Sequence, residues 1–282
     1  MKANPNPNYY FVEWTGDVTG SANPITIVMD KNKSIKANFT QNLRKLTVSS
    51  GTGGTTNPSP GSHDYPHGTT VDVQALPNTN YRFDKWTGGV SGTNNPISVL
   101  MDQDKSIKAN FIRQYKLKIY TTAGGTTNPP PGTHIYDTGT NVSMTATPEE
   151  YNVFINWSGT SSSANNPFSI WMNTDKNYKA NFRYIHPPAN FTGQKVENRT
   201  WSQREYVNVL KWKKNPQNSG LNVAKYLIFQ VEGNNRTLLG ELNSNTFEYW
   251  HRNVEENKQY IYEICVVLDP VREGAPVSVT VQ

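Results

Sequence analysis

Hydrophobic residues alternate with polar ones at a period of two along much of this chain. Ile97, Val99 and Met101 alternate, residues 102–105 are polar, and Ile107, Ala109 and Phe111 alternate again. A period of two places alternate side chains on one face of a β-sheet. The pattern predicts a hairpin with one apolar face. No window keeps apolar residues at helical spacing for long, so we expect an all-β protein with almost no helix.

The same pattern occurs three times. The segments read NPITIVMDKNKSIKANF (23–39), NPISVLMDQDKSIKANF (95–111) and NPFSIWMNTDKNYKANF (166–182). Trp14, Trp86 and Trp157 recur with them, at separations of 72 and 71 residues. Self-similarity at a fixed period indicates an array of small modules. The function of such a chain is expected to depend on the array rather than on one catalytic pocket.

The repeats predict four regions. Residues 1–41 form a partial repeat, 42–113 and 114–184 form two complete repeats, and 187–282 do not repeat. Nothing ahead of Asn8 matches the 46–77 portion of the second repeat, so the first repeat is expected to be only a back half. Two interpretations stay open. Either the chain boundary falls inside a repeat, or a neighbouring chain supplies the missing strands.

An aromatic pair returns at the same point of every repeat. Phe83 and Trp86 of the second repeat recur as Phe11 and Trp14 and as Phe154 and Trp157. Such residues serve either as a platform that stacks on sugar rings or as the plug of a small core. We favour the core plug, because a module this small needs a large side chain to bury a useful apolar area, about 150–250 Å² for an aromatic.

Residues 1 to about 183 resemble the divergent internalin B repeat family. The resemblance is carried by the order GGT, PxPG, GTxVxxxAxP, FxxWxG, NPI and MDxDKSIKANF, best seen in the second repeat. It implies small β-rich modules that serve as spacers, stalks or adhesive elements of bacterial surface and secreted proteins, without enzymatic activity of their own. The third repeat departs from the pattern, with Asn173 and Tyr178 where the second has Asp102 and Ile107.

The C-terminal region has a different pattern. Short apolar strands such as YLIF (226–229) and YIYEICVVL (260–268) alternate with turns, which argues for an antiparallel sandwich of seven strands. The stretch before it, YIHPP (184–188), predicts a stiff, extended boundary. The region resembles a fibronectin type III domain. By that resemblance Trp212 is the core tryptophan, and the Tyr260 hydroxyl bonds to the backbone upstream.

Composition and charge limit the classes of partner that this chain is expected to bind. The formal charge is only +5 over 282 residues and forms no basic stripe, which argues against nucleic-acid binding. The single cysteine, Cys265, lies in an apolar strand and is predicted to be buried and unreactive. No segment reaches the roughly 20 apolar residues of a membrane span, and residues 1–10 lack the apolar core of a signal peptide. Any targeting signal is therefore expected to lie outside this chain.

The sequence yields no catalytic, cofactor-binding or metal site. His63 and His67 stand four apart in a Pro/Gly loop, which leaves chelation open, but His134 repeats His63 while Thr138 stands where His67 does, which favours a turn or packing role. Asp102 and Asp104 begin like a calcium loop, but the Gly and the distal Glu are missing, which favours a hairpin turn.

The sequence is compatible with three functions of the protein. The leading hypothesis is a non-catalytic extracellular or cell-surface protein that acts as a stalk or as an adhesive array toward proteins or glycans. The second is the accessory region of a secreted polysaccharide-degrading enzyme. The third is a subunit of a self-assembling fibre, associating through strand complementation at the incomplete first repeat. The second hypothesis depends on aromatic side chains that could stack on sugars, namely Tyr65, Tyr136, Trp171, Trp201 and Trp250.

Overall fold

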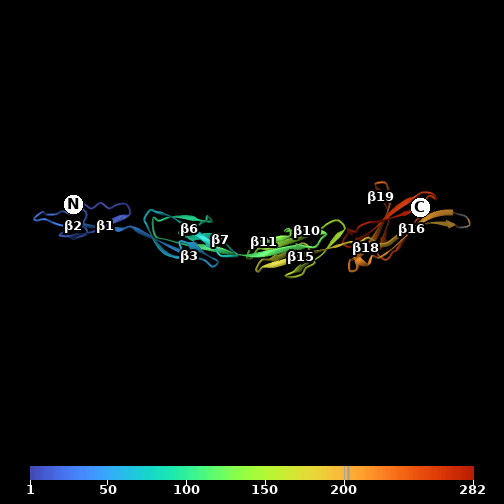
Figure 1. Cartoon of the computed structure of the whole chain (residues 1–282), viewed down its shortest axis with the longest axis horizontal. Helices are drawn as coiled ribbons and strands as arrows, with labels where there is room; N and C mark the ends of the chain where they lie inside the picture. The colour runs from blue at the N-terminus through green and yellow to red at the C-terminus, as the bar shows by residue number, and fades with distance from the viewer. Residues whose placement is uncertain (200, 202–203) are drawn as a thin grey trace. The chain divides into compact units, whose positions relative to one another are not determined.

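The computed structural model describes residues 1–199, 201 and 204–282. The chain divides into two compact units, one made of residues Met1–Tyr115 with Ile135–Thr138 and the other of Lys116–His134 with Gly139–Gln282. Figure 1 shows strands throughout, and the described residues contain no α-helix. The expectation of an all-β protein is confirmed.

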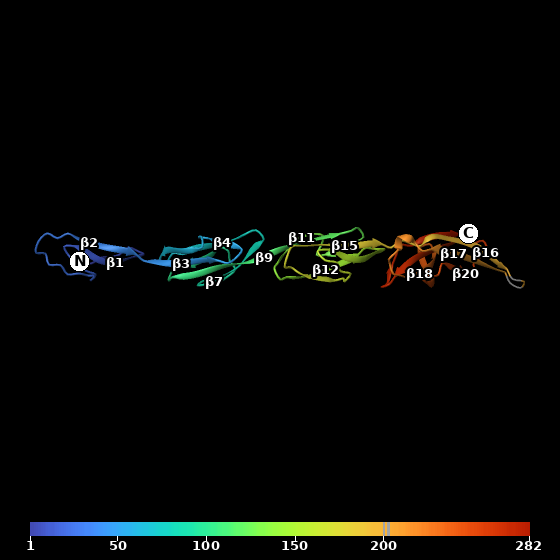
Figure 2. The ribbon, with the colours of Figure 1, turned by 90° about the horizontal axis from the view of Figure 1, so that it is seen from below.

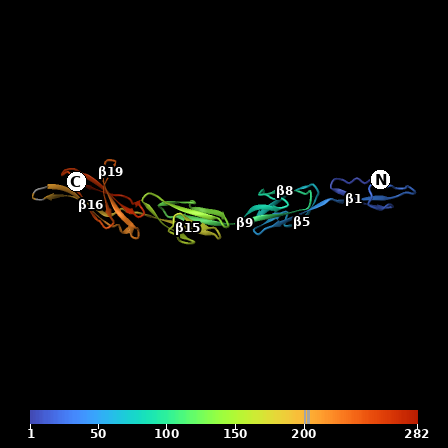
Figure 3. The ribbon, with the colours of Figure 1, turned by 180° about the vertical axis from the view of Figure 1, so that it is seen from behind.

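The second repeat is built from two small sheets. The elements are β3 (Leu43–Ser50), β4 (Gly54–Asn57), β5 (Gly61–Pro66), β6 (Thr70–Pro77), β7 (Tyr81–Gly88), β8 (Ile97–Leu100) and the start of β9 (Lys105–Thr121). One sheet has the order β4-β6-β8. The other joins β3 to β5 and β9, and β9 also pairs with β7. Strands β3, β4 and β7 of this repeat can be followed in Figure 2, and β5 and β8 in Figure 3.

The prediction that residues 97–111 form a hairpin is wrong. Strand β8 pairs with β6, whereas β9 pairs with β7 and β3, so the two halves of the apolar pattern lie in different sheets. The turn at residues 102–105 carries the chain from one sheet to the other. Both apolar faces still point into one core, which explains why the alternation is the same for a hairpin and for a sandwich.

The core of the second repeat holds the side chains that the period of two places inward. Leu46, Val73, Val99, Met101 and Ala109 are all fully buried. Asn95 extends the β6–β8 pairing at one end, since its side-chain amide donates to the Ala75 carbonyl (2.9 Å) and its oxygen accepts from the Ala75 amide (2.7 Å). The third repeat reproduces this pair with Asn166 and Ala146.

The pairing of β3 with β9 is parallel. Leu46 faces Lys105 and Ser50 faces Ala109 across this ladder, although the strands are far apart in sequence. In the third repeat, residues 117–121 of β9 pair in parallel with β15 in the same way. The first half of the single strand β9 thus belongs to the sheet of the second repeat, and its second half belongs to the sheet of the third repeat.

The third repeat follows the same plan. Its further elements are β10 (Gly125–Asn128), β11 (Gly132–Asp137), β12 (Asn141–Pro148), β13 (Asn152–Gly159), β14 (Phe168–Trp171) and β15 (Lys176–Tyr184). One sheet has the order β10-β12-β14, and β13 pairs with β15. Leu117, Ile119 and Met172 are buried in this repeat where Leu46, Val48 and Met101 are buried in the second.

The first repeat contains only one hairpin, formed by β1 (Tyr9–Gly16) and β2 (Ile35–Gln41). Residues 25–29, which match β8, form no strand. The expectation that nothing ahead of Asn8 matches the front half is wrong for residues 1–5. The amide and carbonyl of Ala3 pair with the Asn23 side chain (2.9 and 2.8 Å) as Ala75 does with Asn95. Residues 1–5 thus stand where β6 ends in the second repeat.

Residues 187–282 form an antiparallel β-sandwich, as expected. The elements are β16 (Ala189–Arg199), β17 (Arg204–Lys213), the 3-10 turn η1 (Pro216–Asn218), β18 (Val223–Glu232), β19 (Asn235–Asn243), β20 (Glu248–His251), β21 (Tyr260–Leu268), β22 (Arg272–Glu273) and β23 (Val277–Val281). One sheet has the order β16-β17-β20 and the other β19-β18-β21-β22, with β23 on β21. The strand β16 was not among those singled out from the sequence.

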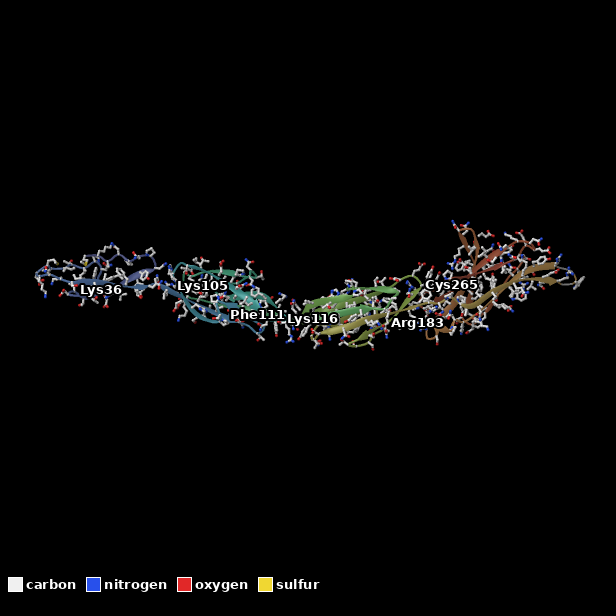
Figure 4. All side chains as sticks on the ribbon, in the orientation of Figure 1. Lys36, Lys105, Phe111, Lys116, Arg183 and Cys265 are labelled. Atoms are coloured by element: carbon white, nitrogen blue, oxygen red, sulfur yellow. The ribbon has the colours of Figure 1, made fainter. Side chains whose placement is uncertain are left out.

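The boundary at residues 184–188 is more than a spacer. Residues 185–188 lie outside the strands, and the Ile185 side chain is fully buried among the core residues of the sandwich, with Val153 of the third repeat packed against the same cluster. The Asn218 side chain pairs with both backbone groups of His186 (2.9 and 2.7 Å). Arg183, labelled in Figure 4, donates to the carbonyl of Ser219 (2.8 Å).

Candidate functional site

The histidines of the repeats have structural partners. The Nε2 atom of His63 lies 2.8 Å from the carbonyl of Ser59, and that of His134 lies 2.7 Å from the carbonyl of Pro130. The same local contact in both repeats agrees with the turn or packing role predicted for this position. Within the described residues, no three His, Cys, Asp or Glu side chains come together in a way that could hold a metal ion.

The acidic residues of the predicted turn also have individual roles. The Asp102 carboxylate pairs with Lys105 (2.8 Å), an attraction that lowers the pKa of Asp102. Asp104 accepts a hydrogen bond from the backbone amide of Lys45 (2.8 Å), and Asp175 does the same for Lys116 (2.9 Å). These two aspartates hold the point at which the parallel pairing of each repeat begins, which agrees with the predicted turn.

Cys265 is fully buried on β21, as the sequence predicts (Figure 4). Burial raises the pKa of its thiol to about 11, because a thiolate is poorly solvated there. The thiol is therefore neutral near pH 7 and behaves as a small apolar side chain.

The recurrent tryptophans are core plugs. Trp14, Trp86 and Trp157 are 3%, 1% and 0% exposed, and each contacts the phenylalanine three residues before it, with ring centroids 5.1–5.8 Å apart. The sugar-platform interpretation of this pair is therefore wrong. In the sandwich, Trp212 is buried against Tyr226, and the hydroxyl of Tyr260 accepts from the amide of Glu255 (3.0 Å), as the resemblance implied.

A buried polar cluster in the sandwich was missed by sequence reasoning. The hydroxyl of Tyr262 lies 2.7 Å from the side-chain nitrogen of Asn208 and 2.8 Å from Nδ1 of His251. Burial raises the pKa of Tyr262 to about 12 and lowers the pKa of His251. Tyr262 and Asn208 are fully buried, so the cluster links β17, β20 and β21 inside the domain and offers no open site.

The five aromatic candidates for glycan stacking divide into two groups. Tyr65 and Tyr136 are half-buried, whereas Trp171, Trp201 and Trp250 are exposed. Trp250 lies beside Val209 on the outer face of the β16-β17-β20 sheet and is 43% exposed. With Thr192, Gln194, Val196 and Lys211 it lines an open hollow of about 560 Å³.

A second exposed apolar region lies on the first repeat. Tyr9, Val28, Met29 and Phe39 are exposed there, Met29 at 72%. In the second repeat Met101, which corresponds to Met29, is fully buried. The sequence signal for this region was the missing front half of the first repeat.

The repeats match a known family. The family described as the divergent InlB B-repeat domain matches residues 1–43, 44–114 and 115–186. The chain belongs to this family. The three matches cover the three repeats and leave the sandwich outside, and they confirm the resemblance that the sequence pattern indicated.

Solved structures similar to the chain include strings of fibronectin type III domains. A two-domain segment of chicken tenascin is 14% identical, covers 77% of this chain and 93% of its own, and gives a TM-score of 0.24. The FN1–FN3 domains of chicken CNTN1 are 9% identical, cover 100% of this chain and 97% of their own, and give a TM-score of 0.28. No protein in a curated set matches the chain.

None of the described residues belongs to a helix of the length and apolarity that a bilayer-spanning segment requires.

Proposed function

We propose that this chain is a non-catalytic modular protein of the cell surface or extracellular space, in which the InlB-type repeats and the sandwich form a stalk or an adhesive array. The supporting observation is that the residues that recur in every repeat are used for structure. The tryptophan lies in the core, the asparagine before β8 or β14 binds the backbone of the neighbouring strand, and an aspartate accepts a backbone amide at the turn.

The parallel ladder suits a stalk. In both complete repeats, a strand at the front of the repeat is held by backbone hydrogen bonds to the last strand, which then continues toward the next part of the chain. Tension applied along the chain would load such a ladder over several hydrogen bonds at once. A surface stalk needs resistance of this kind.

Single-molecule force spectroscopy tests the stalk. Pulling the full chain from both ends is expected to give separate unfolding events for the second repeat, the third repeat and the sandwich. A chain that extends without such events, or that yields in one step, would contradict the proposal. Fractionation of the source cells with an antibody tests the location, and protein confined to the cytosol would exclude a surface role.

A glycan-binding accessory region remains the second candidate, because Trp250 is exposed on a sheet face among polar side chains. Gln194, Lys211 and Thr192 offer hydrogen-bonding groups beside the indole ring. This combination of an aromatic face and polar neighbours is typical of sites that bind sugars.

A glycan array separates the two candidates. The accessory role predicts binding to a polysaccharide that is weakened about tenfold by Trp250→Ala, since an aromatic contact contributes roughly 0.5–1.5 kcal/mol beyond its buried area. Val271→Ala is the matched control, because Val271 is 82% exposed and lies outside the hollow. Equal binding by both variants, or none by the intact chain, would remove this candidate.

A further inference from the structure

Trp171 exposes a large aromatic ring at the edge of a sheet of the third repeat. It ends β14, the outer strand of the β10-β12-β14 sheet, and its side chain is 62% exposed. Among the described residues, no aromatic ring or cation stacks on this indole, and its Nε1 atom has no hydrogen-bond partner. Trp250 differs, because Arg252 lies 5.6 Å from its ring centroid and its Nε1 donates to Glu248. The Trp171 ring is therefore the more accessible of the two.

The side chains beside Trp171 on the outer face of this sheet are polar and uncharged. Asn141 is the cross-strand partner of Trp171, and Ser143 is the partner of Ser169. Strand β12, labelled in Figure 2, alternates exposed Asn, Ser and Thr with buried apolar residues. Strands β10, β12 and β14 contain no charged residue. We call the exposed surface made by Asn141, Ser143, Thr145, Ser169 and Trp171 the Trp171 face.

The second repeat has the same sheet with a different outer face. Leu100, which is 48% exposed, stands where Trp171 stands, and Asp72 stands where Ser143 stands. The Asp72 carboxylate accepts a hydrogen bond from the hydroxyl of Ser98 (2.6 Å). The inward positions of the paired strands are buried in both repeats. The fold therefore requires neither the indole nor the loss of the carboxylate, so both differences are available for binding.

The exposure of the Trp171 face does not come from a missing strand. The β4-β6-β8 sheet of the second repeat and the β10-β12-β14 sheet of the third have the same three strands in the same order. The position of Leu100 and Trp171 is exposed in both repeats, while Met101 and Met172 beside it are fully buried. An open outer face is thus a property of the complete repeat.

The chemistry of the Trp171 face fits a neutral sugar. The apolar face of an indole stacks on the C–H face of a pyranose ring, and its polar edge is able to donate a hydrogen bond. Ser, Thr and Asn side chains both donate and accept hydrogen bonds, as sugar hydroxyl groups do. A charged glycan would need side chains of the opposite charge, and these three strands supply none.

We propose that the Trp171 face binds a neutral polysaccharide, with Trp171 as the stacking platform and with Asn141, Ser143 and Ser169 as hydrogen-bonding partners of the sugar hydroxyls. The site is separate from the hollow beside Trp250, which lies on the sandwich. It deepens the proposed adhesive array by naming the class of partner. Its failure would leave the stalk intact, because the force measurement tests the stalk independently.

Binding of the full chain to polysaccharides tests the proposal. The probes are insoluble cellulose and chitin in pull-down assays and a soluble β-glucan in affinity electrophoresis, with alginate as the acidic comparison. Saturable binding to at least one neutral probe is expected. Trp171→Leu is expected to weaken that binding at least about tenfold, because stacking and the buried area of the ring are lost together. Leu is a suitable replacement, since Leu100 occupies the same position in the second repeat.

Matched variants separate stacking at this face from other contacts. Trp171→Tyr is expected to bind more tightly than Trp171→Leu, because it keeps an aromatic ring. Leu100→Ala and Trp250→Ala are expected to bind as the intact chain does, since both residues lie outside the Trp171 face.

Four results would overturn the proposal. The chain binds none of the neutral probes, or Trp171→Leu binds them as tightly as the intact chain. Alternatively, Trp171→Tyr binds no better than Trp171→Leu, or alginate competes with the neutral probe for the same site.

Discussion

Gly54 leaves space that an aromatic ring fills. The ring of Phe111 lies where a side chain on Gly54 would stand, at 2.4 Å from an ideal Cβ, and the Leu76 carbonyl is 2.7 Å from the same point. The GGT motif of each complete repeat is thus explained by packing against an aromatic residue from the other end of the repeat. No phosphate or other ligand is needed to account for these glycines.

Gly54→Ala is expected to destabilise the second repeat by about 1–3 kcal/mol, the usual cost of overpacking a filled core. Urea unfolding followed by hydrogen exchange in residues 43–113 measures the change. Gly89→Ala is the matched control, because its Cβ would meet only ordinary contacts with Lys105 at 3.5 Å and is expected to cost less than about 0.5 kcal/mol. Equal losses for the two variants would refute the packing account.

His251 makes the sandwich sensitive to pH. Burial lowers the pKa of His251 below its ordinary value of 6.5, so the folded domain resists protonation more than the unfolded chain does. The stabilisation is fully present above pH 6.5 and is lost as the pH falls from there through the lowered pKa of folded His251, because the unfolded chain binds the proton first. The Tyr262 and Tyr260 rings face His251 and supply no negative charge near neutral pH.

Thermal unfolding of the sandwich between pH 7.5 and 5 measures this dependence. The Tm of the intact protein is expected to fall over this range, and that of His251→Gln to fall less, because Gln does not titrate. The carboxylates with lowered pKa values, such as Glu248, act only at lower pH. Parallel curves for the two proteins would show that His251 is not the titrating group.

At the scale of elements, the sequence predicts which residues face inward but not which strands pair. The period of two in residues 97–111 places Val99, Met101, Ile107 and Ala109 in the core correctly. The same alternation fits a hairpin and two facing sheets equally well, so the predicted pairing was wrong. The parallel ladder of β3 with β9 joins distant residues, and no local signal reveals it.

Sequence matches of only a few residues also limit what can be predicted from the sequence. Residues 1–5 read MKANP, and the end of β6 reads VQALP, so only Ala and Pro are shared. The Asn23 side chain revealed the equivalence by making the same two hydrogen bonds to Ala3 that Asn95 makes to Ala75. The buried Asn208, His251 and Tyr262 lie on three different strands. They come into contact only when the whole sandwich has folded. The candidate Trp250, in contrast, was found from its residue type alone.

Arg272 joins the third repeat to the sandwich. It donates to the carbonyls of Asn152 (2.8 Å), Pro148 (3.1 Å) and Glu149. Arg272→Ala is expected to cost about 1.5–3 kcal/mol, because these carbonyls lose a charged donor. Calorimetry is expected to show the unfolding of the third repeat and of the sandwich separating into two steps.

The control for this junction is Arg252→Ala. Arg252 makes an exposed ion pair with Glu205 at 3.3 Å, and such pairs contribute about 0–1 kcal/mol. A calorimetric trace of Arg272→Ala that matches this control would show that the junction does not depend on the three carbonyl contacts.

At the scale of the molecule, each complete repeat has a core of its own, and the first repeat lacks half of one. In an array of this kind, stability is roughly the sum of each repeat and its contacts with neighbours. The first repeat is therefore expected to open most often, because it buries the least apolar surface. Residues 33–37 have no parallel partner strand among the described residues, whereas residues 105–109 and 176–180 each have one.

Hydrogen exchange of the full chain, compared at equivalent positions, tests most directly the claim that the repeats are separate folding units completed by a front-half strand. The account predicts slow exchange at residues 105–109 and 176–180, which pair with β3 and β9, and exchange faster by orders of magnitude at residues 33–37. Equal protection at the three sets of positions would contradict it.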